Sequence, residues 1–224
     1  AYLQDGGKGQ FIQGTSTLNN MYQGSFTIQR PDGKFLTFIG NTTATTNLYD
    51  PASNSFTAGP SVNSGTLSYG AHAFQRPDGK FFVVNGGTGT VTNIYDPITN
   101  TFIAGPALTG NAGNGSHSLQ RPDGKFLIIH GNNGTATTLY DPIANTVTPG
   151  PTLVNAVNLS GHTVPRPDGK FLIVNAAGGS GATNIYDPVT NTVVAGAGAT
   201  AGIYLGALSV QRPDGKWLLV VGND

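Results

Sequence analysis

Acidic side chains are the first candidates for chemistry in this chain, because a pair of carboxylates with separate roles can hydrolyse glycosidic bonds. All 11 acidic residues are Asp. Five of them lie in repeated Arg-Pro-Asp-Gly-Lys segments, four lie in repeated Tyr-Asp-Pro segments, and Asp5 has a place equivalent to these four. Repetition at turn positions indicates turn stabilisation or ion pairing. We therefore predict no catalytic residue and keep a glycoside hydrolase as a minor alternative.

Histidines are the second candidates, since imidazoles can hold Zn²⁺ or Cu²⁺. His72, His117 and His162 each stand four residues before a repeated arginine. A metal site would need their side chains to converge within coordination distance. Phe26 and Leu208 hold the same position in the other two copies, and this interchange with apolar residues favours packing. The chain has no Cys, which excludes disulfides and thiolate metal sites. We predict no metal and no cofactor.

The Arg-Pro-Asp-Gly-Lys segments also define a repeat. Their five arginines follow one another at intervals of 46, 45, 45 and 46 residues. Proline suits the fixed φ of the second turn position and glycine suits a left-handed φ, so each segment predicts a type I turn with a glycine bulge between two strands. The predicted structural residues of the motif are Arg30, Asp32, Gly33, Arg76, Asp78, Gly79, Arg121, Asp123, Gly124, Arg166, Asp168, Gly169, Arg212, Asp214 and Gly215.

Each copy of the repeat contains four short β-rich runs and no helical pattern. In the second copy these runs are residues 71–75, 80–85, 91–95 and 101–103. After its lysine the second run is a nearly unbroken apolar stretch in every copy, interrupted by Thr37 in the first, as expected for a strand that is buried on both faces. Repeats of about 40 to 50 residues with four strands each are typical of a β-propeller. The sequence therefore predicts an all-β, five-bladed β-propeller with four antiparallel strands per blade, as a single domain over residues 1–224.

The fifth copy is split between the two ends of the chain. The last copy stops after its second strand, whereas residues 1–14 match the third and fourth strands of the other copies. We expect the N-terminal strands to complete the C-terminal blade, which would pair open sheet edges and close the ring. The expected blades are residues 15–59, 60–105, 106–150 and 151–196, and a fifth made of 206–224 with 1–14.

The order of motifs within one copy resembles the kelch repeat. The second copy has an Asp-Gly hairpin, an apolar strand that ends near Gly86-Gly87, then Tyr-Asp-Pro, a Thr-Asn turn, an aromatic residue and Gly105-Pro106. The paired glycines are complete in the second copy alone. Five repeats of this length also resemble the tachylectin-2 type of five-bladed lectin. The kelch resemblance implies the propeller fold and leaves the ligand open.

Fixed charge is almost confined to the repeated motifs. The formal net charge is zero, and outside the motifs and Asp5 the charged residues are Lys8 and Asp224. No basic patch is available to bind phosphates, which argues against a nucleic-acid partner. No apolar run is long enough to span a bilayer, so we expect no membrane insertion. A surface rich in Asn, Thr, Ser and Gly favours a secreted or cell-surface protein, and we expect a monomer.

The long connections between copies carry the residues that differ from one copy to the next. They should share one face of the propeller with the connections between second and third strands. Tyrosine rings can stack on sugar rings while amides and hydroxyls bond to sugar hydroxyls, although packing of the loops is an alternative role for the tyrosines. The predicted ligand-binding residues are Tyr22, Tyr69, Asn114, Asn158 and Tyr204.

These observations favour a non-enzymatic binding or scaffold protein with a neutral ligand on the face that carries the long connections. A glycan is the first expected ligand. The alternative is a protein-interaction or purely structural propeller, which includes a designed or reconstructed repeat sequence.

Overall fold

A computed structural model describes residues 2–4, 11–175 and 179–222 of the chain. These ranges contain 20 β-strands joined by turns and loops. Nowhere in them does a helix occur that is long and apolar enough to cross a membrane. The all-β class predicted from the repeat is confirmed.

Four sheets each contain four antiparallel strands in the order of the sequence, which is the arrangement of a propeller blade. Blade 1 contains β3 (Phe26–Gln29), β4 (Phe35–Phe38), β5 (Thr46–Asp50) and β6 (Ser55–Ala58). Blade 2 contains β7 (His72–Gln75), β8 (Phe81–Val84), β9 (Thr92–Asp96) and β10 (Thr101–Ala104).

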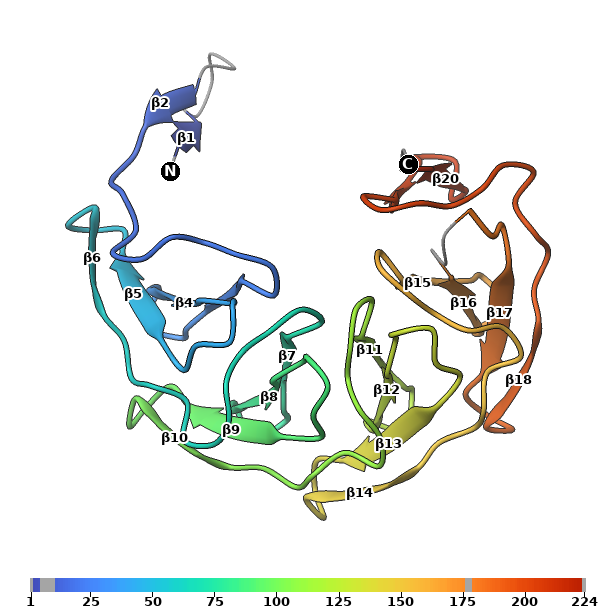
Figure 1. The fold of residues 1–224 in the computed structure, drawn as a ribbon, viewed down its shortest axis with the longest axis horizontal. Coiled ribbons are helices and arrows are strands. Elements are labelled where there is room, and N and C mark those ends of the chain that lie inside the picture. Colours follow the sequence, from blue (N-terminus) through green and yellow to red (C-terminus); the bar gives the residue numbers. More distant parts are fainter. Residues whose placement is uncertain (1, 5–10, 176–178, 223–224) are drawn as a thin grey trace.

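Blade 3 contains β11 (His117–Gln120), β12 (Phe126–Ile129), β13 (Thr137–Asp141) and β14 (Thr146–Pro149). Blade 4 contains β15 (His162–Pro165), β16 (Phe171–Val174), β17 (Thr183–Asp187) and β18 (Thr192–Ala195). The blades follow one another along an arc, with β7, β11 and β15 toward its inside and β10, β14 and β18 toward its outside (Figure 1).

Each end of the arc carries half a blade. Strands β1 (Tyr2–Gln4) and β2 (Phe11–Gln13) form one two-stranded sheet, and β19 (Leu208–Gln211) and β20 (Trp217–Val220) form another. Among the described residues the two sheets are not hydrogen-bonded to each other, and they stand on opposite sides of the gap in the arc (Figure 1). The predicted closure into a five-bladed ring therefore remains a prediction.

The repeated pentapeptides form the tight turns between the first and second strands of each blade. The Arg30 N–H donates to the Lys34 carbonyl at 2.8 Å, and the Gly33 N–H donates to the Arg30 carbonyl at 3.0 Å. The same two bonds recur in the other four copies. Gly33 has a φ of 80°, a left-handed conformation that favours glycine. The motif thus sets the register of every inner hairpin.

The hydrophobic core lies between neighbouring blades. All four residues of β8 and of β12 are buried, because both faces of these strands are covered by an adjacent sheet. One core cluster joins Leu36 and Phe38 of blade 1 to Phe81 and Val83 of blade 2. At the open end of the arc, by contrast, four apolar side chains of the last hairpin, which lie on one face of it, are 44–53% exposed; they are Leu208, Val210, Leu218 and Val220.

Candidate functional site

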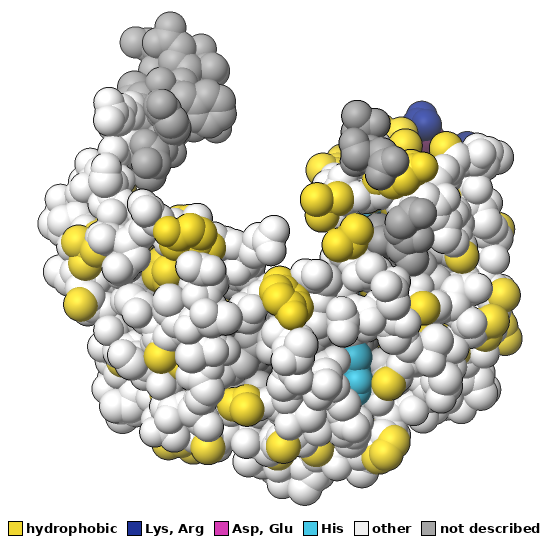
Figure 2. Space-filling model, viewed as in Figure 1, with side chains coloured by type: hydrophobic (Ala, Val, Ile, Leu, Met, Phe, Trp, Pro, Cys, Tyr) yellow, Lys and Arg dark blue, Asp and Glu magenta, His cyan; other side chains and the backbone are white. Residues whose placement is uncertain are grey.

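The long connections and the second-to-third strand connections lie on the same face, because antiparallel strands bring both to one end of each sheet. Two isolated bridges join such connections directly, Thr43 to Leu67 and Gly134 to Val157. The charged turns lie at the opposite ends of the strands. In agreement with this separation, one face of the arc is almost free of charged side chains (Figure 2). We call this uncharged side the long-loop face.

Two hollows open on the long-loop face. The blade-1 hollow has a volume of about 360 Å³ and is lined by Leu18, Asn19, Asn20, Tyr22, Thr43 and Thr45, together with Ile39. The blade-2 hollow has a volume of about 310 Å³, and its lining includes Ser68, Tyr69, Asn85, Gly87, Thr88 and Val91. Tyr22 and Ser68 are separated by one repeat, as are Thr45 and Val91. The two hollows are therefore the same feature in neighbouring blades.

The lining of both hollows is neutral. Among the described residues that line them none is charged. Hydroxyl and amide side chains line both hollows, together with Leu18 and Ile39 in the blade-1 hollow and with several glycines in the blade-2 hollow. Tyr22 is 49% exposed, so much of its ring is accessible from solvent. Gly86 and Gly87 have φ values of 75° and 74°, and a Cβ at Gly86 would clash with the Tyr69 carbonyl oxygen. The paired glycines thus let the β8–β9 connection approach the loop that carries Tyr69.

The five predicted ligand-binding residues do not meet in one site. Tyr22 and Tyr69 line different hollows. Asn158 uses its side-chain oxygen to accept a hydrogen bond from the Leu159 N–H at 2.8 Å, which stabilises its own loop. The Tyr204 ring lies against Gly202 and Gly179, since a Cβ built at Gly179 would be 2.9 Å from the Tyr204 hydroxyl.

Asn114 is partly buried, and its backbone carbonyl accepts a hydrogen bond from the Asn132 N–H at 2.7 Å. Tyr22, Asn158 and Tyr204 hold one position of the repeat, and Tyr69 and Asn114 hold the next. The structure therefore distributes the predicted residues around the face, blade by blade.

Buried amides bind the long connection before blade 2 to the sheet. Asn93 donates to the Asn85 side-chain oxygen at 2.8 Å and accepts from the Ser64 N–H at 3.0 Å. Asn85 in turn donates to the Ser64 carbonyl at 2.8 Å. Asn184 and Asn175 form the same pair in blade 4 at 2.9 Å. The sequence signal for this network is an Asn that recurs at the start of the third strand.

Blade 1 lacks this network. Asn47 holds the position of Asn93 and is only 1% exposed, yet among the described residues neither its Nδ2 nor its Oδ1 has a hydrogen-bond partner. Ile39 replaces Asn85 and lines the blade-1 hollow. An unsatisfied buried polar group costs about 1–3 kcal/mol. Ile39 offers no polar group to Asn47, so the contact that Asn85 makes with Asn93 in blade 2 is missing beside the blade-1 hollow.

The three equivalent histidines hydrogen-bond across blade boundaries. His72 Nδ1 lies 2.9 Å from the Gly70 carbonyl oxygen, so Nδ1 donates and Nε2 accepts from the Ser118 hydroxyl at 2.7 Å. His117 and Thr163 form the same contact at 2.9 Å. Burial lowers the pKa of His72 and of His117 to about 4, so both rings are neutral at physiological pH.

The described residues contain no group of three His, Cys, Asp or Glu side chains placed to hold a metal ion. The hydrogen-bonding role of the histidines was missed in the sequence. The sequence does contain a signal for it: each histidine is matched by a Ser or Thr in the next copy, one residue after the histidine position, as Ser118 is for His72.

The repeated arginines also cross blade boundaries. Arg30 donates from Nη1 to the Tyr95 hydroxyl at 2.7 Å and to the Asn100 side-chain oxygen at 2.6 Å, and from Nη2 to the Pro97 carbonyl at 3.0 Å. Asp32 pairs with Arg30 at 3.0 Å. We call this set of contacts the arginine clamp. It recurs between Arg76 and blade 3 and between Arg121 and blade 4.

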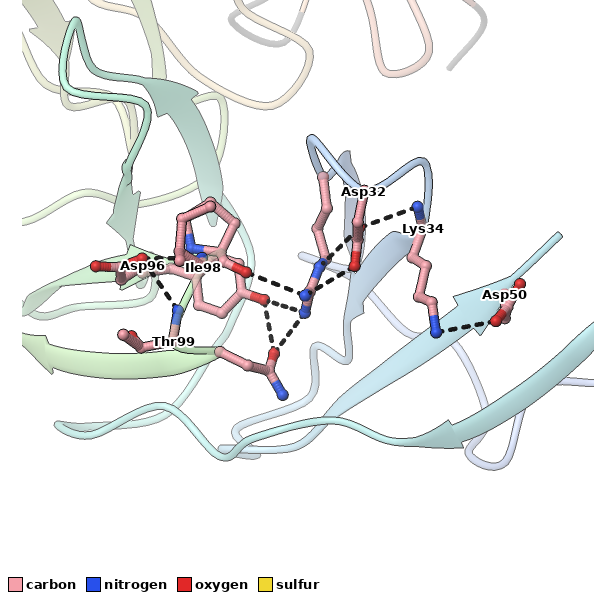
Figure 3. A network of polar contacts seen from close by, with 10 residues as sticks. Asp32, Lys34, Asp50, Asp96, Ile98 and Thr99 are labelled. Carbon is pink, nitrogen blue, oxygen red and sulfur yellow. Dashed lines mark hydrogen bonds and ion pairs between the residues drawn. The ribbon is translucent and has the colours of Figure 1, made fainter. Parts of the chain in front are cut away.

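In four of the five pentapeptides the lysine pairs with an Asp of its own blade. Lys34 lies 2.9 Å from Asp50, and Figure 3 shows this pair beside Asp32. Asp96 of the next blade accepts hydrogen bonds from the Ile98 and Thr99 N–H groups (Figure 3). The hydrogen bond from Lys34 is the main cause that lowers the pKa of Asp50. The repeated carboxylates therefore serve in turns and ion pairs.

Comparison with known proteins identifies the architecture. No protein-family model and no curated protein sequence matches the chain. Among 379 matching chains of solved structures, Kuenenia stuttgartiensis hydrazine synthase aligns with a TM-score of 0.61 and 18% sequence identity, over 92% of this chain and 57% of that chain. The chain thus spans little more than half the length of that neighbour. The likeness extends to the fold alone, and with the repeated four-stranded sheets it identifies a β-propeller architecture.

Proposed function

We propose that this chain is a non-enzymatic binding propeller that holds a neutral ligand in the hollows of its long-loop face. The observation that carries the proposal is the same hollow in two neighbouring blades, each with a tyrosine in its lining and no charged side chain among the residues that line it. A repeated site of this kind suits a ligand that presents the same unit more than once, because linked contacts reinforce one another.

A glycan is the ligand class that fits the lining best. Tyrosine combines an apolar ring face with a polar hydroxyl, and the surrounding Asn, Ser and Thr side chains offer both donors and acceptors to sugar hydroxyls. A neutral lining disfavours phosphate or other strongly charged ligands. The uncharged surface also supports a secreted or cell-surface location for such a binding protein.

We further propose that the working molecule is a closed, kelch-like ring of five blades, comparable to a tachylectin-2-type lectin. Four complete blades and two half-blades make five only if β1 and β2 join β19 and β20. The exposed apolar side chains of the last hairpin support this, since a covering sheet would bury them. Small-angle scattering distinguishes a closed ring from an open arc, and deletion of residues 1–14 should then change the profile and lower the melting temperature sharply.

The rival functions are a protein-interaction propeller and a glycoside hydrolase. A hydrolase needs a carboxylic acid with a raised pKa to protonate the leaving group. Hydrogen bonds lower the pKa of Asp96 and of Asp187, with Lys80 and Lys170 as the largest causes. Ionised, paired carboxylates of this kind favour the binding role.

The test is a glycan array probed with the protein and with Tyr22→Ala and Tyr69→Ala. Each substitution should weaken binding at least several-fold, and the double substitution should abolish it. Ile98→Ala is the matched control, because Ile98 is 82% exposed on a turn at the opposite face. Absence of binding to every glycan, together with specific capture of a defined protein, would favour the interaction propeller instead.

A further inference from the structure

A third cavity lies on the face of blade 1 that is turned toward the gap in the arc, where a preceding blade would pack. It has a volume of about 440 Å³ and is lined by Thr27, Phe35, Thr37, Tyr49, Pro51 and Asn54, among others. Tyr49, Pro51 and Asn54 precede Tyr95, Pro97 and Asn100 by one repeat of 46 residues. The cavity therefore presents the same three acceptors that receive Arg30 in the arginine clamp of blade 2.

The acceptors in this cavity are already arranged for a guanidinium. The Tyr49 hydroxyl lies 2.9 Å from the Asn54 side-chain oxygen, as the Tyr95 hydroxyl lies 2.7 Å from that of Asn100. The difference is cover: Tyr95 and Pro97 are buried, whereas Pro51 is exposed and Tyr49 is partly exposed. The site on blade 1 is thus formed but not covered by a preceding blade.

At the other end of the arc, Arg212 has no such acceptors around it among the residues that the structure describes. The Arg212 side chain is 56% exposed, against 9% for Arg30 and 10% for Arg76 and for Arg121. Its turn is nevertheless intact: the Arg212 N–H donates to the Lys216 carbonyl at 2.8 Å, and Asp214 pairs with its guanidinium at 3.2 Å. Arg212 therefore has the conformation of a clamp arginine without a partner blade among the described residues.

We propose that the blade-1 cavity is an arginine site whose occupant is Arg212 of the same chain. This inference rests on the proposed five-bladed ring, in which the blade that contains Arg212 precedes blade 1. The guanidinium then donates to the Tyr49 hydroxyl, the Asn54 side-chain oxygen and the Pro51 carbonyl. The cavity lining is neutral, and Asp214 enters with Arg212 as its counter-ion, as Asp32 does for Arg30.

The same chain is favoured over a second copy for two reasons. Both partners belong to one molecule, so closure is an intramolecular event with a high effective concentration. In addition, Arg212 and Tyr49 would repeat the clamp of the other boundaries at the boundary that the arc leaves open. Arg166 is less well matched, because Gln4 stands at the tyrosine position of its next half-blade. Closure is thus expected to depend most on Arg212.

Thermal unfolding of Arg212→Lys tests this contact. Arg76→Lys is the matched control, because Arg76 makes the arginine clamp with blade 3 in the structure. A lysine keeps the charge but cannot serve three acceptors in a fork. Both substitutions should lower the melting temperature by a similar amount, roughly 2–4 °C for a chain of this size. Combination of Arg212→Lys with Tyr49→Phe should lower it less than the sum of the single effects. A shift for Arg76→Lys with none for Arg212→Lys would overturn the proposal.

Spin labels test whether Arg212 of the same chain or of a second copy occupies the cavity. The chain has no Cys, so Ser53→Cys and Pro213→Cys introduce one label on each side of the open boundary, at exposed turn positions. Thr99→Cys with Pro31→Cys is the matched pair across a filled boundary. The two pairs should give the same distance distribution in pulsed electron paramagnetic resonance. A signal that disappears on dilution with unlabelled protein would overturn the proposal in favour of a second copy.

Failure of this contact and failure of the ring give different results. A scattering profile of a closed ring with a silent Arg212→Lys overturns the arginine contact and leaves the ring standing. An open-arc profile with a long distance between positions 53 and 213 overturns both. Glycan binding through Tyr22 and Tyr69 is measured separately and does not depend on either outcome.

Discussion

His72 and Ser118 hydrogen-bond across the boundary between blades 2 and 3, with 2.7 Å between Nε2 and Oγ. His162 and Ser209 form the same contact two boundaries further along. At the first boundary Phe26 replaces the histidine, and Ala73 stands where the hydroxyl would be. Histidine and hydroxyl therefore occur together, and an apolar pair takes their place in the hydrophobic cluster between blades 1 and 2.

This pairing predicts a strong coupling between positions 72 and 118. Ser118→Ala leaves the acceptor nitrogen of His72 without a partner and should cost about 1–3 kcal/mol of unfolding free energy. Adding His72→Phe reproduces the Phe26–Ala73 pair and should recover most of that loss. Urea unfolding of both single variants and the double variant measures the coupling. Additive effects would contradict the pair as a unit.

The same burial makes the protein sensitive to mild acid. His72, His117 and His130 have a pKa of about 4 in the folded protein because burial disfavours the charged ring, whereas an unfolded histidine titrates near 6.5. The unfolded state therefore binds protons first, and stability should fall as pH drops from about 6.5 to 4. Each unit of pKa difference corresponds to about 1.4 kcal/mol per histidine.

Denaturant midpoints measured between pH 7 and pH 4 test this prediction. His130→Asn is the matched variant, because Asn85 and Asn175 hold the equivalent position in other blades. It should retain the fold and reduce the slope of stability against pH. Asp ordinarily titrates near 3.8, and the Asp residues with a lowered pKa also cost stability below about pH 5. The slope between about pH 6.5 and pH 5 therefore reports the histidines. A midpoint independent of pH over this range would contradict the burial of these rings.

The fold could be predicted from the sequence because its signals are local. Turn residues, apolar runs and their period lie within one copy, and they specified the four strands of each complete blade. The arginine clamp could not be predicted in the same way, because Arg30 and Tyr95 are 65 positions apart and chemistry between copies leaves no local pattern. Only the shared period of the arginine, tyrosine and asparagine positions hints at it.

The sequence predicted which face carries the candidate site, but not how the predicted residues are arranged on that face. Composition placed neutral, variable residues on the long-loop face, and Tyr22 and Tyr69 do line hollows there. Whether a loop leaves a hollow depends on backbone contacts such as those of Gly86 with Tyr69. Asn158 shows the limit, since its side chain bonds within its own loop, and residue type alone does not reveal this.

The unpartnered amide of blade 1 predicts an asymmetry between two equivalent positions. Asn93→Leu breaks bonds to Asn85 and to the loop at Ser64, and should cost about 2–4 kcal/mol because buried partners are left unpaired. Asn47→Leu removes an amide with no hydrogen-bond partner in the part of the chain that the structure describes, and should be neutral or stabilising. Chemical unfolding of the two variants measures both effects. Equal losses would mean that Asn47 has a hydrogen-bond partner in solution.

The two kinds of ion pair in the repeat should differ widely in their effect on stability. Arg121 is 10% exposed and donates to the Tyr186 hydroxyl at 2.6 Å and to the Asn191 side-chain oxygen at 2.8 Å. Arg121→Met leaves the buried Tyr186 hydroxyl, the partly buried Asn191 and Asp123 without their donor, so it should cost about 3 kcal/mol or more. Lys125 is 45% exposed beside Asp141, and exposed pairs contribute about 0–1 kcal/mol.

Lys125→Met is therefore the matched control for Arg121→Met, since both replace a long cation by the same apolar chain within one pentapeptide. Unfolding is best measured in urea or by heat, because guanidinium chloride is a salt and would screen the ion pairs. Lys125→Met should have an unfolding midpoint near that of the unmodified chain, whereas that of Arg121→Met should be clearly lower. Added salt should lower the small contribution of Lys125 further. It should leave that of Arg121 nearly unchanged, because the acceptors of Arg121 across the boundary are neutral and at least partly buried. Similar losses in the two variants would mean that the clamp stabilises the blades through charge alone.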